Sequence, residues 1–385
     1  MEEAKEFMHD RATFSRNHDI AFICFSSSFG GLELTTVRLA RDFGQRMANC
    51  TLVVPAGTPL AAQAAAHALH VEYLEPGLKY GDILASRRLA RILKSLRVDV
   101  AVVMQSKDIN VVTAAKLAYP ALKIVFYQQM QSGVSKRDFL HTWMFKKLSL
   151  WISLTARMKQ DVIEHTRMPE ELVRVIPLGR DTDLFDPQMY DSSNARGGFD
   201  LPSGRPIIGM LGRLDPQKGQ EEFLRSVPLV LKQRSDAYFL IAGEETDGEE
   251  GFRRHLVDLT HHLGVSDHIR FLPFTNDVPQ FMSAIDIFVL PSYAETYGLV
   301  LIEAMAMEKP VIATSAGGVP EIVEHGRTGL LVPPRDHEAL ADAMVTLLRN
   351  PELRASLSKQ ARAQVLERFD SSRCLDHLVA SLDAL

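Results

Sequence analysis

The sequence has few cysteines, three in 385 residues. Cys24, Cys50 and Cys374 lie far apart, are odd in number and form no C-x-x-C pair, so the sequence indicates neither a disulfide framework nor a zinc site. We interpret all three as small buried hydrophobic side chains.

A second absence concerns membranes. No run of about 18 apolar residues occurs, so no spanning helix is predicted. The charged residues 1–10 lack the apolar core of a secretory signal. We therefore expect a cytoplasmic protein, and we interpret residues 1–18 as an N-terminal extension.

The sequence also lacks a basic excess, because its formal net charge is −5. Proteins that bind nucleic acids normally carry a strongly positive face, so we expect no nucleic-acid partner. A length of 385 residues exceeds what one hydrophobic core usually supports, and a hydrophobic content of 46% is enough for two. We expect two domains, and the composition does not indicate an oligomeric state.

Apolar β-rich runs alternate with helix-period segments, which predicts an α/β fold with parallel sheets. The predicted strands are 20–25, 50–54, 99–103, 123–127, 151–154, 173–176, 206–211, 237–242, 268–272, 284–290 and 310–314. The stretch 186–204 is rich in Asp, Ser, Asn, Gly and Pro and is typical of a linker. We predict two doubly wound domains, residues 19–185 and 205–365, facing each other across a cleft, because open parallel sheets bind ligands beyond the carboxyl ends of their strands.

Two glutamates, Glu295 and Glu303, flank a predicted loop-to-helix junction. Residues 298–307 have the pattern of a short, largely apolar helix. The first N–H groups of such a helix lack intrahelical partners and favour an anion. The predicted phosphate site consists of Thr296, Tyr297, Gly298 and Leu299. A carboxylate on each side of a bound diphosphate would accept hydrogen bonds from two polyols, a ribose and a hexose.

Glu303 would lie in a helix that is otherwise apolar on every side. Because an unpaired buried carboxylate is costly, we expect a partner for it. The alternative is that two glutamates with this spacing arise by chance on a surface helix.

Two cations follow the first strand of the second domain. Arg213 offers a planar fork and Lys218 a point charge, so together they would neutralise a diphosphate leaving group. No Ser or Thr follows Lys218, which argues against the ATPase phosphate loop. A solvated turn is the alternative.

A glycine-rich turn, Ser26 to Gly31, follows the first strand of the chain. It lacks the full G-x-G-x-x-G pattern, so a nicotinamide cofactor has little support. Gly30 and Gly31 would let the backbone approach a ligand phosphate or an acceptor, and an ordinary tight turn fits equally well. Glu321, after a second glycine pair at 317–318, is interpreted as a helix-start residue.

Four segments together resemble the family 4 retaining glycosyltransferases. They are Gly212-Arg213-Leu214-x-x-x-Lys218-Gly219, the E-x7-E pair from Glu295 to Glu303, Gly317 to Val323, and Ile176 to Asp183. The resemblance implies the GT-B fold, in which two Rossmann-like domains share the work and the C-terminal one binds the nucleotide sugar. It also implies a final helix, here about residues 366–385, that crosses back onto the first domain.

The resemblance implies a role for each site residue. Arg213 and Lys218 would bind the diphosphate, Glu303 the ribose, and Glu295 with the neighbouring amides the sugar and phosphate. Gly31 would approach the diphosphate or the acceptor from the other domain. No metal or other cofactor is needed, because the cations and the helix start stabilise the charge. The donor would be a UDP-, GDP- or ADP-sugar, and the acceptor a hydroxyl group of a sugar, a lipid-linked glycan or a small molecule.

The chain departs from this family at one place. Many relatives carry a histidine after the strand 123–127, where this chain has Gln128 and Gln129. Glutamine can hydrogen-bond a sugar hydroxyl but cannot act as a base, so the acceptor proton would pass to the leaving phosphate. Attack on the same face, with retention, is compatible with this. Gln129 is our candidate beside the transferred sugar, and His141 is interpreted as a packed or surface residue.

A segment around residues 136–148 has two interpretations. Its basic and aromatic or apolar residues are Lys136, Arg137, Lys146, Lys147, Phe139, Trp143, Phe145 and Leu148. Such a helix could rest on an anionic surface at the inner side of a membrane, or it could pack on the sheet as an ordinary amphipathic helix.

Two other functions stay open at the level of the sequence. The first is a sugar-nucleotide epimerase or hydrolase on the same scaffold, which would form products without an acceptor. The second is a non-catalytic nucleotide-sugar-binding partner, which the glutamines at 128 and 129 leave possible.

Overall fold

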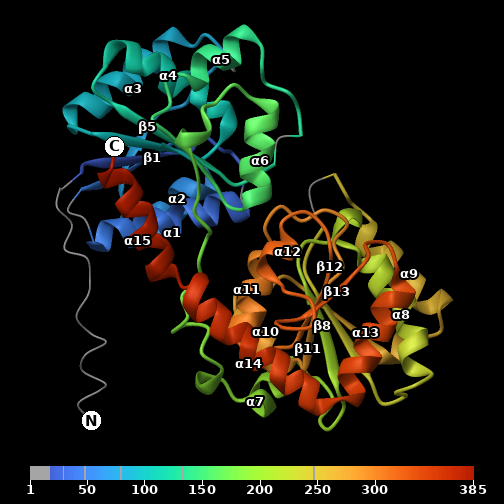
Figure 1. Cartoon of the computed structure of the whole chain (residues 1–385). Helices are drawn as coiled ribbons and strands as arrows, with labels where there is room; N and C mark the ends of the chain where they lie inside the picture. The colour runs from blue at the N-terminus through green and yellow to red at the C-terminus, as the bar shows by residue number, and fades with distance from the viewer. Residues whose placement is uncertain (1–17, 29, 47–48, 79, 132, 246–247) are drawn as a thin grey trace. The chain divides into compact units, whose positions relative to one another are not determined.

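The computed structural model describes residues 18–28, 30–46, 49–78, 80–131, 133–245 and 248–385. The chain divides into two compact units. The first comprises the chain up to residue 177 together with residues 374–385, and the second comprises residues 178–373. Each unit is a sheet with helices on both faces (Figure 1). The predicted extension over residues 1–18 lies, except for its last residue, outside the described residues.

The first unit contains a seven-stranded parallel sheet in the order β3-β2-β1-β4-β5-β6-β7. Its strands are β1 (Ile20–Ile23), β2 (Cys50–Val54), β3 (His70–Tyr73), β4 (Val100–Val103), β5 (Lys123–Gln128), β6 (Leu150–Ser153) and β7 (Val173–Val175). Its helices are α1 (Gly31–Arg46), α2 (Pro59–Ala66), α3 (Ile83–Ser95), α4 (Ile109–Ala118), α5 (Phe139–Phe145), α6 (Ala156–His165) and most of α15 (Ser371–Asp383). In Figure 1, α3, α4 and α5 lie above the sheet, and α1, α2 and α15 lie below it.

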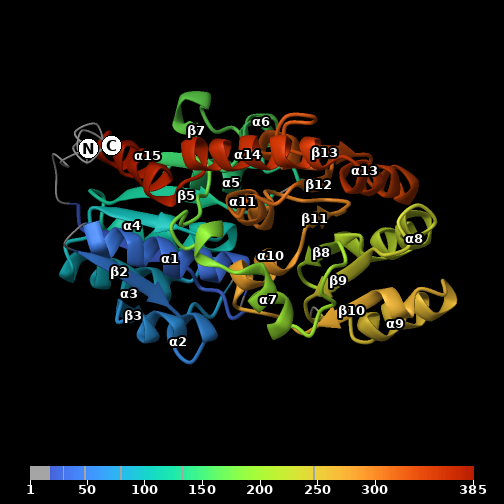
Figure 2. The same cartoon turned by 90° about the horizontal axis from the view of Figure 1, so that it is seen from below.

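The second unit contains a six-stranded parallel sheet in the order β10-β9-β8-β11-β12-β13. Its strands are β8 (Ile207–Leu211), β9 (Tyr238–Ala242), β10 (Ile269–Leu272), β11 (Ile287–Leu290), β12 (Val311–Thr314) and β13 (Leu330–Val332). Its helices are α7 (Ser192–Gly198), α8 (Gln220–Leu231), α9 (Phe252–His262), α10 (Val278–Ala284), α11 (Leu299–Ala306), α12 (Val319–Ile322), α13 (His337–Arg349) and α14 (Pro351–Arg368). Figure 2 shows β8, β9 and β10 side by side.

The winding direction of each sheet reverses at its centre, which decides where ligands can bind. In the first unit the reversal lies between β1 and β4, and in the second it lies between β8 and β11. The loops that leave two such strands diverge to opposite faces and open a crevice at the carboxyl edge. Both sheets are covered on two sides, so their central strands are almost wholly apolar and buried, as in β4 and β8.

The structure confirms the predicted α/β architecture of two Rossmann-like sheets. It adds two strands that the sequence analysis omitted, β3 and β13, which both lie at a sheet edge. Edge strands need no continuous apolar run, and β3 is exposed or half-buried along its whole length.

The stretch 186–204, predicted as a linker, includes α7 and belongs to the second unit. Arg196 of α7 fastens it, because its guanidinium pairs with Asp286 at 2.7 Å and donates to the carbonyl of Ala284. The final segment passes from the second unit to the first within α15, at residue 374. Among the described residues, the structure has no helix with the length and apolar character needed to span a bilayer.

The three cysteines carry free thiols. Cys24 and Cys374 are buried and Cys50 is half-buried. Burial raises the pKa of Cys24 to about 12, which keeps this thiol protonated and unreactive.

Candidate active site

The carboxyl ends of β8 and β11 bring the predicted cation and carboxylate together. Arg213 and Lys218 follow β8, and Glu295 follows the neighbouring β11. Lys218 Nζ donates to Glu295 Oε2 at 2.7 Å, and both side chains are partly buried. Arg213 is exposed and forms no ion pair with any other described residue. A bound phosphate would therefore meet one cation that is already oriented and one that is free to move.

Gly219 is required for the approach of Lys218. Its φ of +77° lies in the left-handed region, and a Cβ there would come within 2.1 Å of the carbonyl oxygen of Pro291. The two loops are joined by a hydrogen bond of 2.8 Å from the N–H of Tyr293 to the carbonyl of Gln217. The loop that carries Lys218 is thus docked on the loop that leads to Glu295.

A second glycine pair positions Glu295 itself. Gly317 has a φ of +57°, and a Cβ on it would lie 1.9 Å from the carbonyl oxygen of Glu295. The same oxygen accepts a hydrogen bond of 2.9 Å from the N–H of Gly318. The sequence analysis interpreted this turn only as the approach to Glu321. The signal that it missed was the close backbone contact that a Gly-Gly pair permits.

The predicted phosphate site is the start of α11. Gly298 has a φ of +90° and precedes the helix, which begins at Leu299, one residue later than the sequence pattern suggested. The first N–H groups of a helix have no intrahelical partner, and here no side chain of the described residues caps them. Thr296 and Leu299 are half-buried and Gly298 is buried. Tyr297 is 5% exposed and donates to the carbonyl of Leu178 at 2.8 Å.

Glu303 has the charged partner that its predicted burial requires. Both Glu303 and Arg180 are 8% exposed, and Arg180 Nε lies 2.5 Å from Glu303 Oε1. Burial raises the pKa of the Glu303 carboxyl, and the neighbouring Arg180 opposes this rise. The sequence analysis did not identify Arg180 as this partner, because 123 positions of chain separate the two residues and only the fold brings them together.

In the first unit, the two predicted glycines have no local structural reason to be glycine. Gly31 does not have a positive φ, and a Cβ on it would meet no described atom within 4 Å; a Cβ on Gly30 would lie in ordinary contact, 3.6 Å from Glu33 Oε2. Open space beside a glycine is what a close approach of ligand to backbone requires. Phe29, which precedes them, lies outside the described residues.

The two glutamines at the end of β5, Gln128 within the strand and Gln129 just after it, have different surroundings. Gln128 is buried, and its Oε1 accepts hydrogen bonds from Trp151 Nε1 at 2.9 Å and Ser153 Oγ at 3.1 Å, so it fastens β5 to β6. Gln129 has a buried Nε2 without a hydrogen-bond partner among the described residues. Gln128 Nε2, by contrast, donates to the carbonyl of Met130 at 3.0 Å, so Gln129 is the one of the two whose amide N–H groups are both unpaired in the described part of the chain.

A carboxylate that the sequence analysis did not single out lies at the β1–β4 reversal. Asp108 is 3% exposed, and its Oδ2 accepts a hydrogen bond of 2.8 Å from the N–H of Phe25. Burial raises its pKa to about 7, because the effect of burial is larger than the opposing effects of that hydrogen bond and of Lys107. The sequence carried no signal for it, since one aspartate in a turn is common.

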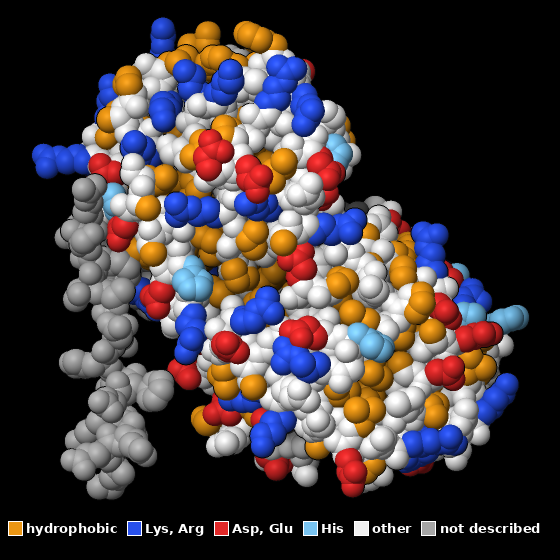
Figure 3. Space-filling view, in the orientation of Figure 1, with side chains coloured by type: hydrophobic (Ala, Val, Ile, Leu, Met, Phe, Trp, Pro, Cys, Tyr) orange, Lys and Arg blue, Asp and Glu red, His pale blue; other side chains and the backbone are white. Residues whose placement is uncertain are grey.

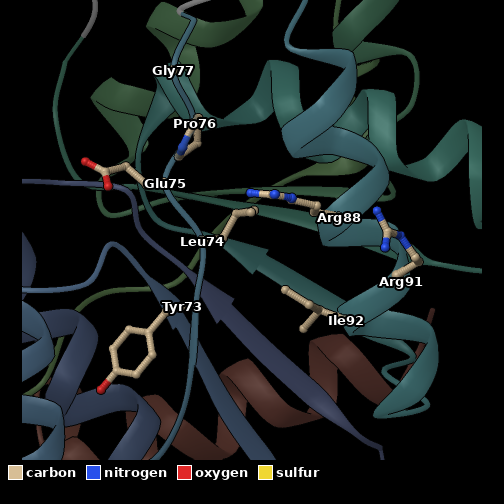
Figure 4. Close-up of a pocket in the computed structure, with 8 residues that line it drawn as sticks. All are labelled: Tyr73, Leu74, Glu75, Pro76, Gly77, Arg88, Arg91 and Ile92. Carbon is tan, nitrogen blue, oxygen red and sulfur yellow. The ribbon is translucent and has the colours of Figure 1, made fainter.

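Other features of the first unit do not include the predicted site residues. A cavity of about 860 Å³ lies between residues 73–77 and α3, where Arg88 and Arg91 extend toward it (Figure 4). On α6, potential ligand atoms of Asp161, Glu164 and His165 lie within 4.8 Å of one another, an arrangement that exposed acidic groups often show without an ion. We place the candidate site at α11 because the converging polar groups and the strained glycines are there.

Comparison with known proteins identifies the family. The model for glycosyl transferases group 1 matches residues 191–364, and the model for glycosyltransferase family 4 matches residues 29–184. The chain belongs to glycosyltransferase family 4. The two matches lie on either side of residues 185–190 and cover every strand of both sheets except β1.

Similar curated proteins cover part of this chain. The D-inositol 3-phosphate glycosyltransferase of Saccharomonospora viridis is 34% identical over 54% of this chain and 49% of its own length. The lipopolysaccharide core biosynthesis mannosyltransferase of Rhizobium meliloti is 32% identical over 51% of this chain and 56% of its own length. The chain thus spans about half the length of these family 4 relatives.

Solved structures show the GT-B fold over nearly the whole chain. Anabaena HepE in complex with UDP has a TM-score of 0.85 at 24% identity and covers 95% of this chain and 100% of its own. A glycosyltransferase from Rickettsia africae has a TM-score of 0.86 at 23% identity, covering 94% of this chain and 97% of its own. At this identity the likeness concerns the fold of this family 4 chain alone.

Proposed function

We propose that this chain transfers a sugar from a nucleoside diphosphate sugar to a hydroxyl acceptor. The observation that carries the proposal is the convergence of Lys218, Glu295 and the uncapped start of α11 at the carboxyl ends of β8 and β11. These groups are a cation, a carboxylate that accepts hydrogen bonds from hydroxyl groups, and free amides in one crevice. Together they fit a diphosphate joined to a polyol.

In this proposal the second unit binds the donor. Arg213 and Lys218 contact the diphosphate, and their charge stabilises the leaving group as the bond to the sugar breaks. Glu295 accepts hydrogen bonds from sugar hydroxyls, with the amides of residues 296–299 on the phosphate. Glu303 accepts from the ribose. The first unit would hold the acceptor near Gly30, Gly31 and Gln129.

The proposed reaction forms a bond between the acceptor oxygen and the anomeric carbon. The bond from that carbon to the phosphate oxygen breaks, and its electron pair leaves with the nucleoside diphosphate. Because Gln129 cannot take a proton, the acceptor proton passes to the departing phosphate oxygen. Attack from the face that the phosphate leaves would retain the anomeric configuration, which NMR of the product can establish.

The names of similar proteins support a place in glycan or glycolipid biosynthesis. They include enzymes for inositol phosphate and for a lipopolysaccharide core, and HepE was crystallised with UDP. UDP-, GDP- and ADP-sugars are therefore the donors to test first. A sugar, a lipid-linked glycan and a small polyol are the acceptor classes.

The test is a panel of these nucleotide sugars with and without mixed acceptors, read by release of nucleoside diphosphate. We expect acceptor-dependent release with one donor, and loss of most turnover in Glu295→Ala and Lys218→Ala. Lys232→Ala, at the far end of α8, serves as the matched control. Release without acceptor would favour an epimerase or hydrolase, and tight donor binding without turnover would favour a non-catalytic partner. No donor binding at all would overturn the proposal.

We also propose peripheral contact with an anionic membrane, through Phe139 of the predicted segment and through two residues outside it, Ile83 and Leu84. In the segment 136–148, Phe145 and Leu148 are buried, which supports packing on the sheet for that part. Phe139 is 86% exposed, and Ile83 and Leu84 are 65% and 63% exposed. In Figure 3, hydrophobic side chains lie among Lys and Arg at the end of this unit that carries α3, α4 and α5.

The first turns of α3 and α5 form this apolar surface. The rings of Tyr80, just before α3, and His141, in α5, lie 6.4 Å apart, so the two turns are neighbours. The exposed face of α3 continues with Arg87, Arg88 and Arg91, and α3 contains no acidic residue. Apolar side chains next to a basic helix face fit the interface of an anionic bilayer on the cytoplasmic side.

Vesicle sedimentation tests this contact. We expect binding to vesicles of mixed phosphatidylglycerol and phosphatidylcholine, weaker binding to phosphatidylcholine alone, and loss of binding in the triple variant Ile83→Ser, Leu84→Ser, Phe139→Ser. Phe274→Ser, which removes a side chain 54% exposed in the second unit, is the control. Equal sedimentation of the triple variant and the parent would rule out this surface.

A further inference from the structure

The ion pair between Arg180 and Glu303 is more deeply buried than the other charge pair of the candidate site. Its side chains are each 10% exposed, whereas those of Lys218 and Glu295 are 21% and 14% exposed. Arg180 is the one charged group among the described residues that bears on the ionisation of Glu303. A buried carboxylate without such a partner would take up a proton, so the charge of Glu303 depends on Arg180.

The backbone around Arg180 is fixed from two directions. Its N–H donates to the carbonyl of Phe369 at 2.8 Å, and its carbonyl accepts from the N–H of Ser371 at 2.8 Å. Gly179 lets this pairing form, because a Cβ on it would lie 2.7 Å from the carbonyl oxygen of Asp370. The guanidinium is therefore presented from a paired, parallel segment and not from a free loop.

The same segment also contacts the loop that leads into α11. Tyr297, two residues before the helix begins, donates to the carbonyl of Leu178 through a buried hydrogen bond of 2.8 Å. One short stretch of chain thus contacts both this loop and the carboxylate in the second turn of α11. The relative positions of Arg180, Glu303 and the proposed phosphate site are set by these contacts.

The guanidinium retains hydrogen-bonding capacity beside Glu303. Arg180 Nε and Nη1 are buried and have no hydrogen-bond partner among the described residues, although Nε lies 2.5 Å from Glu303 Oε1. The N–H direction, and not the distance, prevents that bond. Buried donors of this kind normally have an acceptor. A ligand hydroxyl can donate its proton to a carboxylate and accept from an N–H at the same time.

We propose that Arg180 and Glu303 together form the site for a ribose hydroxyl, and that Arg180 sets the specificity for ribonucleotides over deoxyribonucleotides. Glu303 accepts the hydroxyl proton, and Arg180 holds the carboxylate in place and donates to the hydroxyl oxygen. This inference rests on the proposed binding of a nucleoside diphosphate in the second unit. It adds to that proposal a binding residue outside α11, Arg180, and a preference for ribose over deoxyribose in the nucleotide.

Calorimetric binding of deoxy analogues tests the inference on the full chain. The probe is whichever of UDP, GDP and ADP binds the parent protein, together with its 2′-deoxy and 3′-deoxy forms. In the parent we expect one deoxy form to bind at least about tenfold more weakly, the size of one hydrogen bond to a charged group. In Arg180→Met we expect weak binding of the ribonucleotide and little further loss with the deoxy form.

Two more variants separate positioning from general damage. Arg180→Lys keeps a charge beside Glu303 but loses the planar fork, so we expect binding with a reduced preference for the ribonucleotide. Arg196→Met removes another partly buried arginine of the same unit, which pairs with Asp286 at the amino end of β11, and should leave that preference unchanged.

The outcomes distinguish the two proposals. If the parent protein binds none of the three nucleoside diphosphates, the proposed function fails. If it binds one and Arg180→Met, shown to be folded by circular dichroism, prefers the ribonucleotide as strongly as the parent does, the inference about Arg180 is wrong. Should Arg180→Met fail to fold, Arg180→Lys decides: a preference equal to that of the parent overturns the inference, and a reduced preference supports it.

Discussion

Asp108 gives a stability prediction whose size and sign follow from the structure. Its pKa is raised from 3.8 to about 7 because the carboxyl group is buried at the end of β4. In the unfolded chain the same group ionises near its ordinary value. Between these two values the folded protein binds a proton that the unfolded chain has released, so the free energy of unfolding falls as pH rises.

The magnitude comes from the difference between the two pKa values. At 1.36 kcal/mol per pKa unit, the full effect is about 4 kcal/mol, present below pH 3.8 and lost by about pH 7. About 3 kcal/mol of it falls between pH 5 and pH 8. Asp108→Asn removes the titration and keeps an oxygen that can accept from the N–H of Phe25. We expect the variant to gain about 3 kcal/mol relative to the parent over that interval.

Urea titration followed by tryptophan fluorescence is the assay. The chain has two tryptophans, Trp143 and Trp151, and both lie in the first unit with Asp108, so their emission reports the unfolding of that unit. Free energies of unfolding for parent and variant are compared at several pH values from 5 to 8. Only the pH dependence of the difference in free energy between variant and parent is interpreted. A difference that does not change with pH reflects how the Asn side chain packs.

Two results would contradict the reasoning. Parallel pH profiles for parent and Asp108→Asn would mean that Asp108 does not titrate in this range. A variant that becomes less stable relative to the parent as pH rises would mean that the ionised carboxylate is favoured. Asp82, whose pKa is lowered below 3.8 by hydrogen bonds from the backbone N–H groups of Ala85, Gly77 and Leu78, provides a control, because its stabilising effect is lost only at lower pH: Asp82→Asn should differ from the parent by a constant amount between pH 5 and pH 8.

Three further predictions concern the glycines and the tyrosine near the sites. Gly317→Ala should destabilise the protein by about 1–3 kcal/mol and weaken donor binding, because it strains the backbone and displaces Glu295; Gly326→Ala, which has a φ of +75° but no atom within 4 Å, should cost stability only. Gly31→Ala should leave the melting temperature unchanged and reduce turnover if a ligand approaches the backbone there, and unchanged turnover would remove Gly31 from the site. Tyr297→Phe loses one buried hydrogen bond and should lower the free energy of unfolding by about 1 kcal/mol, measured by denaturant titration.

The sequence predicted the parts of the fold in which a local pattern reports burial. Central strands such as β4 and β8 are apolar along their length because helices cover both faces, so their runs were visible in the sequence. β3 escaped prediction because an edge strand need not be apolar. α7 escaped because its polar and glycine-rich sequence resembles a linker, and what holds it is a tertiary contact from Arg196 to Asp286.

The candidate site likewise has parts that the sequence predicted and parts that it did not. The order of residues along the chain fixed the places of Arg213, Lys218 and Glu295 at strand ends, and the reversal between β8 and β11 brings those ends together. The different surroundings of Gln128 and Gln129 were not predictable, because β5 ends at Gln128 and only the neighbouring strand β6 supplies the donors that pair with its side chain.

The sequence by itself determined the fold class, the family and the residues that could carry charge to a ligand. Those features depend on local periodicity and on motifs that are contiguous or closely spaced. The tertiary structure alone decided which groups are paired, buried or strained. Arg180 meets Glu303, Gly317 meets Glu295 and Asp108 meets Phe25 across long stretches of chain, and burial and pairing are properties of the folded surroundings that no local pattern contains.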